Sequence, residues 1–264
     1  MQENYRSWVI NYQKFHDQKT LFDQLKFLIG FAILAPSGHN SQPWKFSIHG
    51  NTIILAPEAT RALPKSDPNE RQLFLSLGCA LENLLVAADY YGFDTEVEYR
   101  PSANIAAKIT FSKRPHSDLS ENHLIFSIPK RHTNRNPYED RLPDTSFINW
   151  LKNLNNQELH LELIENEISR HKIADISLQA LIETMDEPHF REELSQYLKS
   201  NFTKSKLGMP GFSHGLPAPI SLIASPLIRR VNMNRLSFKK DEQIQWFQPN
   251  AIQLIKDYLA TLIK

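Results

Sequence analysis

Apolar residues recur every three or four positions in two stretches of the first half of the chain. Between Leu21 and Ala35 this spacing predicts a helix, which we expect to end at Ala35 because the residue before a proline is disfavoured in the α region. The stretch from Asp67 to Gly92 is apolar over most of its length. It predicts a long buried helix, opened by Asp67-Pro68 and closed near the glycine.

The second half of the chain carries helical spacing as well. Residues 168–200 predict helix with a break at Glu187-Pro188, because a proline interrupts the helical hydrogen bonds. Residues 250–264 place their apolar side chains on one face of a further predicted helix. Residues 208–226 are rich in proline and glycine, and they predict a loop or lid instead.

Strands are predicted where apolar and polar residues alternate. Residues 44–57 alternate around a central glycine and asparagine, which indicates a hairpin. Residues 95–101 and 106–113 predict two more strands, and the alternating leucines of residues 159–165 predict another. Helices thus alternate with hairpin-like strands, and the chain has neither a G-x-G-x-x-G turn nor a phosphate-binding P-loop. The pattern therefore predicts an α+β fold rather than a Rossmann fold.

The composition is typical of a globular protein, with 264 residues, 41% hydrophobic and 22% charged. A formal net charge of +1 gives no reason to expect a nucleic-acid partner. The N-terminus carries no apolar signal segment, and the longest apolar run, near residues 25–35, is too short to span a bilayer. We therefore expect a cytoplasmic protein without stable membrane insertion.

Cysteine and histidine give no sign of a metal site. Cys79 is the only cysteine, which excludes an internal disulfide and a site made of several thiolates. It falls within the predicted long helix, where a small core residue is expected rather than a nucleophile. The ten histidines are scattered without the close pairs that metal ligation favours, so we expect no bound metal.

Residues 34–46, LAPSGHNSQPWKF, place small and hydrogen-bonding residues directly after the first predicted helix. Asn40 and Gln42 each carry both a donor and an acceptor, and the small residues beside them leave backbone N–H groups accessible. Such a mixture suits a flat heterocycle edged with carbonyl and N–H groups, such as the pyrimidine ring of a flavin. The alternative is a helix end and turn that lead into an edge strand.

A second cluster comprises Arg131, His132, Thr133 and Arg135. Two guanidinium groups and a hydroxyl within five residues favour a phosphate clamp, because arginine forms charge-assisted bonds to phosphate. The alternative is an ordinary basic turn at the surface.

Taken together, the two segments resemble a known family. APSGHNSQPW resembles the signature of the FMN-dependent nitroreductases, and KRHTNRNPY resembles the segment with which those enzymes hold the FMN phosphate and ribityl chain. The reversed order of the segments is similar to the duplicated single-chain branch called Acg-like. This resemblance implies a nitroreductase-like α+β fold with a mixed sheet flanked by helices and two pseudo-repeats. Residues 1–125 would form the first repeat. Residues 126–264 would form a second, shortened one with a lid-like segment at 200–245.

The resemblance also implies roles for individual residues. The cofactor would be FMN. The backbone of Pro36, Ser37 and Gly38 would contact its ring system, with His39 as a neighbour. Asn40 would bind the pyrimidine side, near Gln42. The phosphate and ribityl end would be held by Arg131, Thr133 and Arg135, with His132 beside them. No residue is assigned as a catalytic acid or base, because in this family the flavin itself carries the hydride.

The implied activity is reduction of a nitroaromatic, a quinone or an unknown small acceptor, with NAD(P)H as electron donor. Two alternatives remain open, which are a non-catalytic protein that binds and sequesters FMN and a scaffold of the same fold that has lost flavin. We expect a monomer or a homodimer.

One asymmetry of charge lies in the second half. Residues 194–240 contain no acidic residue, whereas the helices predicted before them are acidic. The basic stretch is interpreted as a flavin lid in which Arg229 or Arg230 meets an anionic group, as a surface for anionic lipid or nucleic acid, or as a neutralising neighbour of the acidic helices. Glu192-Glu193 is interpreted as part of a solvated helix face.

Overall fold

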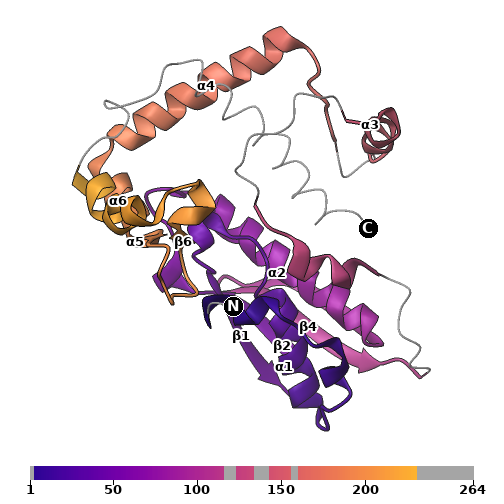
Figure 1. Cartoon of the computed structure of the whole chain (residues 1–264). Coiled ribbons are helices and arrows are strands. Elements are labelled where there is room, and N and C mark those ends of the chain that lie inside the picture. The colour runs from indigo at the N-terminus through magenta and orange to yellow at the C-terminus, as the bar shows by residue number, and fades with distance from the viewer. Residues whose placement is uncertain (1–2, 116–122, 134–142, 156–159, 231–264) are drawn as a thin grey trace. The chain divides into compact units, whose positions relative to one another are not determined.

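The computed structural model describes residues 3–115, 123–133, 143–155 and 160–230 (Figure 1). The chain divides into two compact units. The first unit comprises Met1–His132 together with Glu192–Arg229, and the second comprises Thr133–Arg191 and Arg230–Lys264. The predicted pseudo-repeats stay a prediction, and the predicted helix at residues 250–264 lies outside the described residues.

The α-helices of the described residues are α1 Leu21–Ala32, α2 Arg71–Tyr90, α3 Thr145–Lys152, α4 Glu167–Asp186, α5 Pro188–Tyr197 and α6 Ala218–Arg230. The strands are β1 Trp44–His49, β2 Thr52–Pro57, β3 Phe93–Ser102, β4 Ile105–Lys113, β5 Leu198–Lys199 and β6 Met209–Pro210. Short 3-10 helices lie between them, at Glu3–Trp8, Tyr12–Phe15, Gly38–Asn40, Ala59–Arg61, His123–Phe126, Ile128–Lys130 and Gly211–His214. Helix and strand together confirm the predicted α+β class.

The first unit is built on a four-stranded sheet in the order β1-β2-β4-β3. Each neighbouring pair in it is antiparallel. This differs from the mixed sheet that the family resemblance predicts. The reason is the connectivity. Strands β1 and β2 form one hairpin, and β3 and β4 form another. Helix α2 connects the two hairpins, and β4 then pairs antiparallel with β2. The hairpin predicted at residues 44–57 is confirmed, with His49 opposite Thr52.

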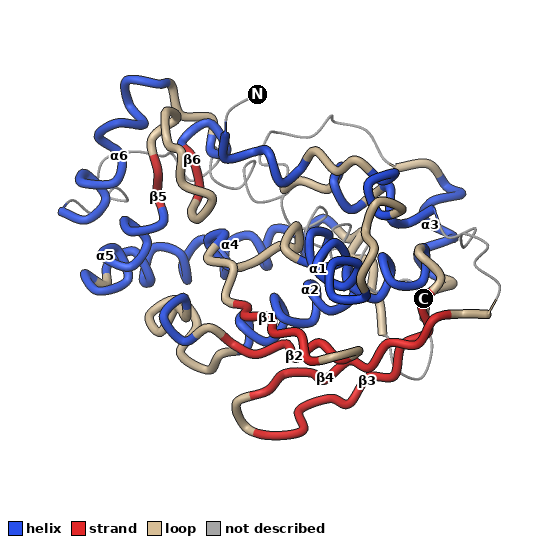
Figure 2. Tube along the Cα trace, turned by 90° about the horizontal axis from the view of Figure 1, so that it is seen from below, coloured by secondary structure: helices blue, strands red, loops and turns tan. Residues whose placement is uncertain are grey.

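Helices α1 and α2 lie on one side of this sheet (Figure 2). The sheet turns Ile53, Leu55 and Ile109 toward them, and these side chains are fully buried. The alternate positions are less buried: Glu98 and Lys108 are exposed, and Ile54 is half-buried. Each buried aliphatic side chain contributes about 1.5–3 kcal/mol, so burial at this interface stabilises the first unit.

Helix α1 ends at Ala32, three residues before the predicted end at Ala35. The N–H of Leu34 bonds to the carbonyl of Phe31, three residues back, and Ala35 repeats this pattern with Ala32. The chain thus tightens from an α-helix into 3-10 turns as it approaches Pro36. The tightening sets the direction in which the following loop leaves the core.

Helix α2 confirms the long buried helix that the sequence predicts. It begins at Arg71, and the Oδ2 atom of Asp67 accepts a hydrogen bond of 2.8 Å from the N–H of Leu73. By length and composition α2 is apolar enough to cross a membrane, but 61% of its apolar window is buried inside the fold. That burial is what a core helix requires. In the part of the chain that the structure describes, no second helix passes the same test.

The strand predicted at residues 159–165 is wrong over its described part, which has no regular secondary structure. The side-chain amide of Asn155 bonds to both the N–H and the carbonyl of Leu161. It accepts from the N–H at 2.6 Å and donates to the carbonyl at 3.1 Å. These side-chain bonds occupy the groups with which Leu161 would pair in a sheet.

The loop predicted at residues 208–226 is wrong in its second half, where α6 begins at Ala218. Pro219 lies in the first turn of α6, where a missing N–H costs nothing. Residues 208–217 contain only the short strand β6 and a 3-10 turn, as expected for a loop.

The predicted helix break at Glu187-Pro188 is confirmed, because α4 ends at Asp186 and α5 begins at Pro188. The guanidinium group of Arg191 donates to the carbonyls of Met185 and Asp186 at 2.6 and 2.9 Å. These bonds satisfy carbonyl groups that the end of α4 leaves unpaired.

We predict that Asp67→Ala lowers the free energy of unfolding by about 1–2 kcal/mol, because it leaves the buried N–H of Leu73 without its acceptor. Urea denaturation followed by circular dichroism measures the change. Asp67→Asn keeps an acceptor oxygen and is the matched control, for which a loss of less than half that size is expected. Equal losses in both variants would contradict a capping role.

We predict that the protein loses stability at alkaline pH because Tyr91 ionises there and no longer donates its hydrogen bond. Its hydroxyl donates to the carbonyl of Tyr12 at 3.0 Å, and burial, together with Tyr90 and Tyr12, raises its pKa above the ordinary 10.0. A raised pKa in the folded state gives stability that is present below about pH 10 and is lost as the pH rises further.

Tyr91→Phe tests this prediction. The variant loses about 1 kcal/mol at pH 7 with the hydrogen bond, but its stability falls less than that of the wild type between about pH 10 and 12. Thermal unfolding at a series of pH values gives the comparison. Parallel stability curves for the two proteins would show that Tyr91 does not titrate as expected.

Candidate functional site

The loop between α1 and β1 holds the first predicted cluster, and its backbone is strained. His39, Asn40 and Gln42 have φ angles of 51°, 53° and 51°. Among the described residues, only Glu70 and Arg100 are further non-glycine residues with positive φ. Strained backbone of this kind costs roughly 1–3 kcal/mol per residue and gathers at functional sites. Three such residues within four positions therefore mark this loop as the candidate site.

Hydrogen bonds inside the loop hold this conformation. The hydroxyl of Ser37 accepts from the N–H of Gln42 at 2.9 Å, and the N–H of Ser41 bonds to the carbonyl of Gly38. Arg61 donates to the carbonyl of Gln42 at 3.0 Å. The alternative interpretation, a turn leading into an edge strand, is correct for the backbone path into β1. It does not explain why the turn uses strained non-glycine residues.

The side-chain amides of Asn40 and Gln42 bind a distant part of the same unit. Asn40 Nδ2 donates to the carbonyls of Gly208 at 2.9 Å and Lys206 at 3.2 Å. Gln42 Nε2 donates to the carbonyl of Lys206 at 2.6 Å. In return, the N–H of Gly208 donates to the backbone carbonyl of Asn40 at 3.1 Å. The two amides that the sequence assigns to a ligand are therefore occupied by backbone of the lid-like segment.

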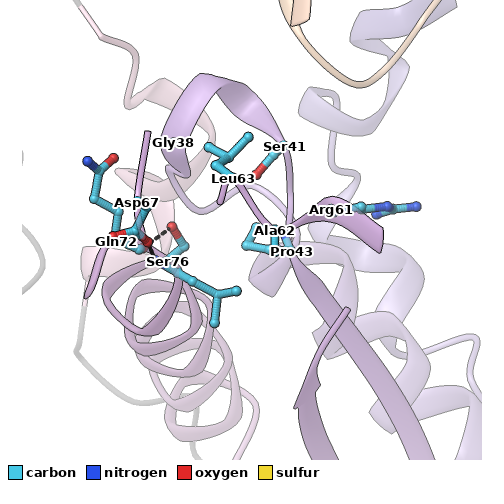
Figure 3. A pocket seen from close by; sticks show the side chains of 10 residues that line it. Gly38, Ser41, Pro43, Arg61, Ala62, Leu63, Asp67, Gln72 and Ser76 are labelled. Atoms are coloured by element: carbon cyan, nitrogen blue, oxygen red, sulfur yellow. Dashed lines mark hydrogen bonds between the residues drawn. The ribbon is translucent and has the colours of Figure 1, made fainter. Parts of the chain in front are cut away.

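A small pocket lies beside this loop (Figure 3). Its empty volume is about 200 Å³, open solvent included. Asp67, Gln72 and Ser76 lie on one side of it, and Arg61 extends away from them. A Cβ atom on Gly38 would lie 3.0 Å from Leu63 and 3.2 Å from Gln72, so the glycine allows the loop to pack closely on this wall. The pocket is lined by Gly38, Ser41, Pro43, Arg61, Ala62, Leu63, Asp67, Gln72, Leu73 and Ser76.

A buried carboxylate ties α5 to the loop before α2. Glu193 is 7% exposed and accepts from the N–H groups of Lys65 and Ser66 at 3.0 and 2.9 Å. It also accepts from the hydroxyl of Ser66 at 2.5 Å. Because the hydroxyl proton of Ser66 points to Glu193, the 3.0 Å contact between Ser66 Oγ and His39 is a bond donated by the His39 Nε2–H. Glu193, Ser66 and His39 thus form one hydrogen-bonded chain.

Tyr197 lies next to this chain. Its ring centroid is 6.0 Å from that of His39. Burial raises the pKa of its hydroxyl, the negative charge of Glu193 raises it further, and Arg61 opposes the shift. The phenol therefore stays protonated well into the alkaline range.

The second predicted cluster makes separate contacts. The guanidinium carbon of Arg131 lies 5.8 Å from the ring centroid of Trp8, and the backbone N–H of Arg131 donates to the carbonyl of Ser127. His132 Nδ1 donates to the carbonyl of Lys130 at 3.2 Å. Thr133 is exposed and opens the second unit, while Arg135 lies outside the described residues. A phosphate clamp made of these residues stays a prediction.

Several residues of the site were missed by the sequence reasoning. They are Ser66, Tyr197, the backbone of Lys206–Gly208 and Glu193, and the interpretation of Glu193 as solvated is wrong. The partners Ser66 and Glu193 are 127 positions apart, so no local pattern relates them. The absence of acidic residues after Glu193 was a signal that this segment differs, but it did not indicate the partner. In the described ranges, no group of three or more histidine, cysteine, aspartate or glutamate side chains is arranged to hold a metal ion.

No family model matches the chain. An uncharacterized protein of Mycobacterium tuberculosis (strain ATCC 25618 / H37Rv) is 24% identical over 246 residues, which are 90% of this chain and 67% of that protein. The protein named "Putative NAD(P)H nitroreductase acg" from the same strain is 32% identical over 137 residues, 50% of this chain and 40% of that protein.

A further protein named as a putative NAD(P)H nitroreductase, from the same organism, is 30% identical over 118 residues. That stretch is 44% of this chain and 34% of the relative. The similarity to named nitroreductases thus covers about half of this chain and well under half of each of those relatives. It supports the nitroreductase family and, in general terms, an oxidoreductase.

We predict that Glu193→Ala lowers the free energy of unfolding by about 2–3 kcal/mol, because the N–H groups of Lys65 and Ser66 lose a charged acceptor. Glu192→Ala is the matched control on the same helix. Glu192 is partly exposed and pairs with the exposed Arg229, so its loss costs less than about 1 kcal/mol. Urea denaturation measures the free energy of unfolding of both variants. Equal losses would contradict a stabilising role for the hydrogen bonds that Glu193 accepts.

Proposed function

We propose that the protein is an FMN-binding oxidoreductase that passes hydride from NAD(P)H, by way of flavin, to a nitroaromatic, a quinone or another small acceptor. The observation that carries this proposal is the strained loop at residues 38–42, which aims two amide side chains and a backbone carbonyl at a single partner. The names of the relatives support the reaction class.

The residues fit a flavin in their chemistry. Asn40 and Gln42 offer donors for carbonyl oxygens, and the carbonyl of Asn40 offers an acceptor for an N–H group. The pocket beside them is too small as it stands, because its empty volume of about 200 Å³ includes open solvent and the enclosed space is far smaller than a small-molecule site of roughly 300 Å³ or more. For Asn40 and Gln42 to bind an isoalloxazine, residues 206–208 would also have to move away, because their carbonyls occupy both amides.

Bound FMN would supply hydride transfer, and the chain would supply binding and orientation. The backbone of Pro36, Ser37 and Gly38 would lie against the ring, and Asn40 and Gln42 would fix its pyrimidine edge. Arg131 would hold the phosphate together with Thr133 and Arg135, and His132 would lie beside them. His39, which Ser66 and Glu193 orient, would face the same ligand.

A second function is favoured by one specific observation, the occupation of both amides by residues 206–208. A segment that closes over the site would keep substrates out, as in a protein that sequesters FMN without turnover. The two functions differ in one measurement. A catalyst oxidises NADPH in the presence of a quinone at a rate well above that of free FMN, and a sequestering protein does not.

We further propose two pseudo-repeats in the chain, a cytoplasmic location and a monomer or homodimer. Gel filtration with light scattering gives the mass of the particle. A scaffold that has lost flavin would give a folded, colourless particle of either mass.

We predict that the purified protein retains FMN, with absorbance near ~450 nm after desalting. Arg131→Ala weakens FMN binding by about 10- to 100-fold, because one charge-assisted bond to the phosphate is lost. The affinity is measured by quenching of flavin fluorescence, and thermal unfolding checks that the variant is folded.

Two controls accompany this test. Lys130→Ala removes a neighbouring exposed charge and leaves FMN affinity within about twofold of the wild type. Riboflavin lacks the phosphate, so Arg131→Ala weakens its binding much less than that of FMN. Failure of the wild-type protein to bind either flavin would refute the proposed function.

A further inference from the structure

Residues 206–208, called the strap below, present three backbone groups to the strained loop. The carbonyl of Lys206 receives bonds from both side-chain amides, at 3.2 Å from Asn40 and 2.6 Å from Gln42. The N–H of Gly208 donates to the carbonyl of Asn40 at 3.1 Å, and the carbonyl of Gly208 accepts from Asn40 Nδ2 at 2.9 Å. Along the chain the strap therefore offers a carbonyl, an N–H and a second carbonyl.

A cyclic imide carries the same groups in the same order. The pyrimidine ring of a flavin presents one carbonyl, an N3–H and a second carbonyl along one edge. Asn40 and Gln42 can donate to the two carbonyls, and the backbone carbonyl of Asn40 can accept from the N–H. The loop is thus complementary both to the strap and to an imide edge, and it cannot bind both at once.

We propose that the strap is an internal competitor that imitates the imide edge of the ligand, so that strap and ligand exclude one another at Asn40 and Gln42. This inference rests on the proposed function, because the flavin is the imide whose edge is read. The protein then exists in a closed state, in which the strap holds the amides, and an open state, in which the ligand holds them.

The attachment of the strap is small enough to be reversible. Its neighbours β5 and β6 pair over only two residues each, Leu198–Lys199 with Met209–Pro210. Within the strap the side chain of Lys206 is exposed and that of Leu207 is half-buried, and the buried Met209 anchors the chain directly after it, so the strap itself is held mainly by backbone bonds. A segment with few buried apolar contacts opens locally at low free energy, without unfolding of the core.

Gly208 is the residue on which the closed state depends. Its φ is 91°, and a Cβ atom there would lie 2.5 Å from the carbonyl oxygen of Tyr197 and 2.9 Å from the Lys199 side chain. Gly208→Ala therefore dislodges the strap. Gly215 has a similarly positive φ of 70° with nothing within 4 Å of such an atom, so Gly215→Ala adds backbone strain without a clash. It is the matched control in the same segment.

The first experiment uses the wild-type protein and compares FMN with its N3-methyl derivative. Methylation removes the imide N–H and places a methyl group against the carbonyl of Asn40. A site that reads this N–H discriminates strongly against an analogue without it, so we expect binding to weaken by at least about tenfold. Fluorescence titration measures both affinities, and this test needs no variant that must fold.

The second experiment follows the strap itself by limited trypsin digestion. Cleavage after Lys206 requires its carbonyl to leave the two amides, so saturating FMN increases the cleavage rate about tenfold. Gly208→Ala is cleaved rapidly without FMN and binds FMN about tenfold more tightly, because the open state no longer has to be populated first. Gly215→Ala behaves like the wild type in both assays. Mass spectrometry identifies the cleaved bond.

The outcomes distinguish failure of the proposed function from failure of the competition between strap and ligand. If neither the wild type nor Gly208→Ala binds flavin, the proposed function is wrong and this inference falls with it. If FMN and its N3-methyl derivative bind equally, the loop does not recognise the imide edge, and the proposal that the protein binds flavin is retained. If FMN binds and cleavage after Lys206 is unchanged or slower, the strap is a structural tie or a lid over bound flavin, and competition is refuted.

Discussion

The packing of α1 and α2 against one face of the four-stranded sheet is the constraint on which the rest of the first unit depends. It buries the aliphatic face of the sheet, and it fixes both ends of the loop at residues 36–43. One end of this loop leaves α1 in tight 3-10 turns, and the other enters β1 at the buried Trp44. With both ends held by the core, a short loop can be kept in a conformation that it would not adopt alone.

Strain in that loop is balanced by bonds from residues far away in the sequence. The amides of Asn40 and Gln42 donate to the carbonyls of Gly208 and Lys206. The carboxylate of Glu193 accepts from the backbone N–H of Ser66, before α2. Both ties come from residues 192–229, which belong to the first unit although residues 133–191 of the second unit separate them from its first segment along the chain. The candidate site is therefore assembled from two segments that only the fold brings together.

This arrangement connects the proposed oxidoreductase to a means of controlling it. The same three groups that would orient a flavin are satisfied by the protein's own backbone, so the loop is not left with unpaired amides when no ligand is present. Such a site is stable in both states, and the balance between them depends on a few hydrogen bonds. Under the proposal, a closed, sequestering protein and an open catalyst would differ in the populations of two states and not in fold.

The sequence by itself determined the elements whose signal is local. The spacing of apolar residues predicted α2, the β1–β2 hairpin and the break before Pro188, because periodicity and proline act over a few residues. It also selected the loop at residues 36–42, because small and amide residues after a buried helix are unusual. The tertiary structure decided what depends on long-range partners. Leu161 lies outside any sheet because Asn155 occupies its backbone, α6 forms despite its prolines, and Glu193 is buried because Ser66 meets it across 127 positions. A chain's local pattern carries no record of such pairings, since each partner alone is compatible with a solvated surface.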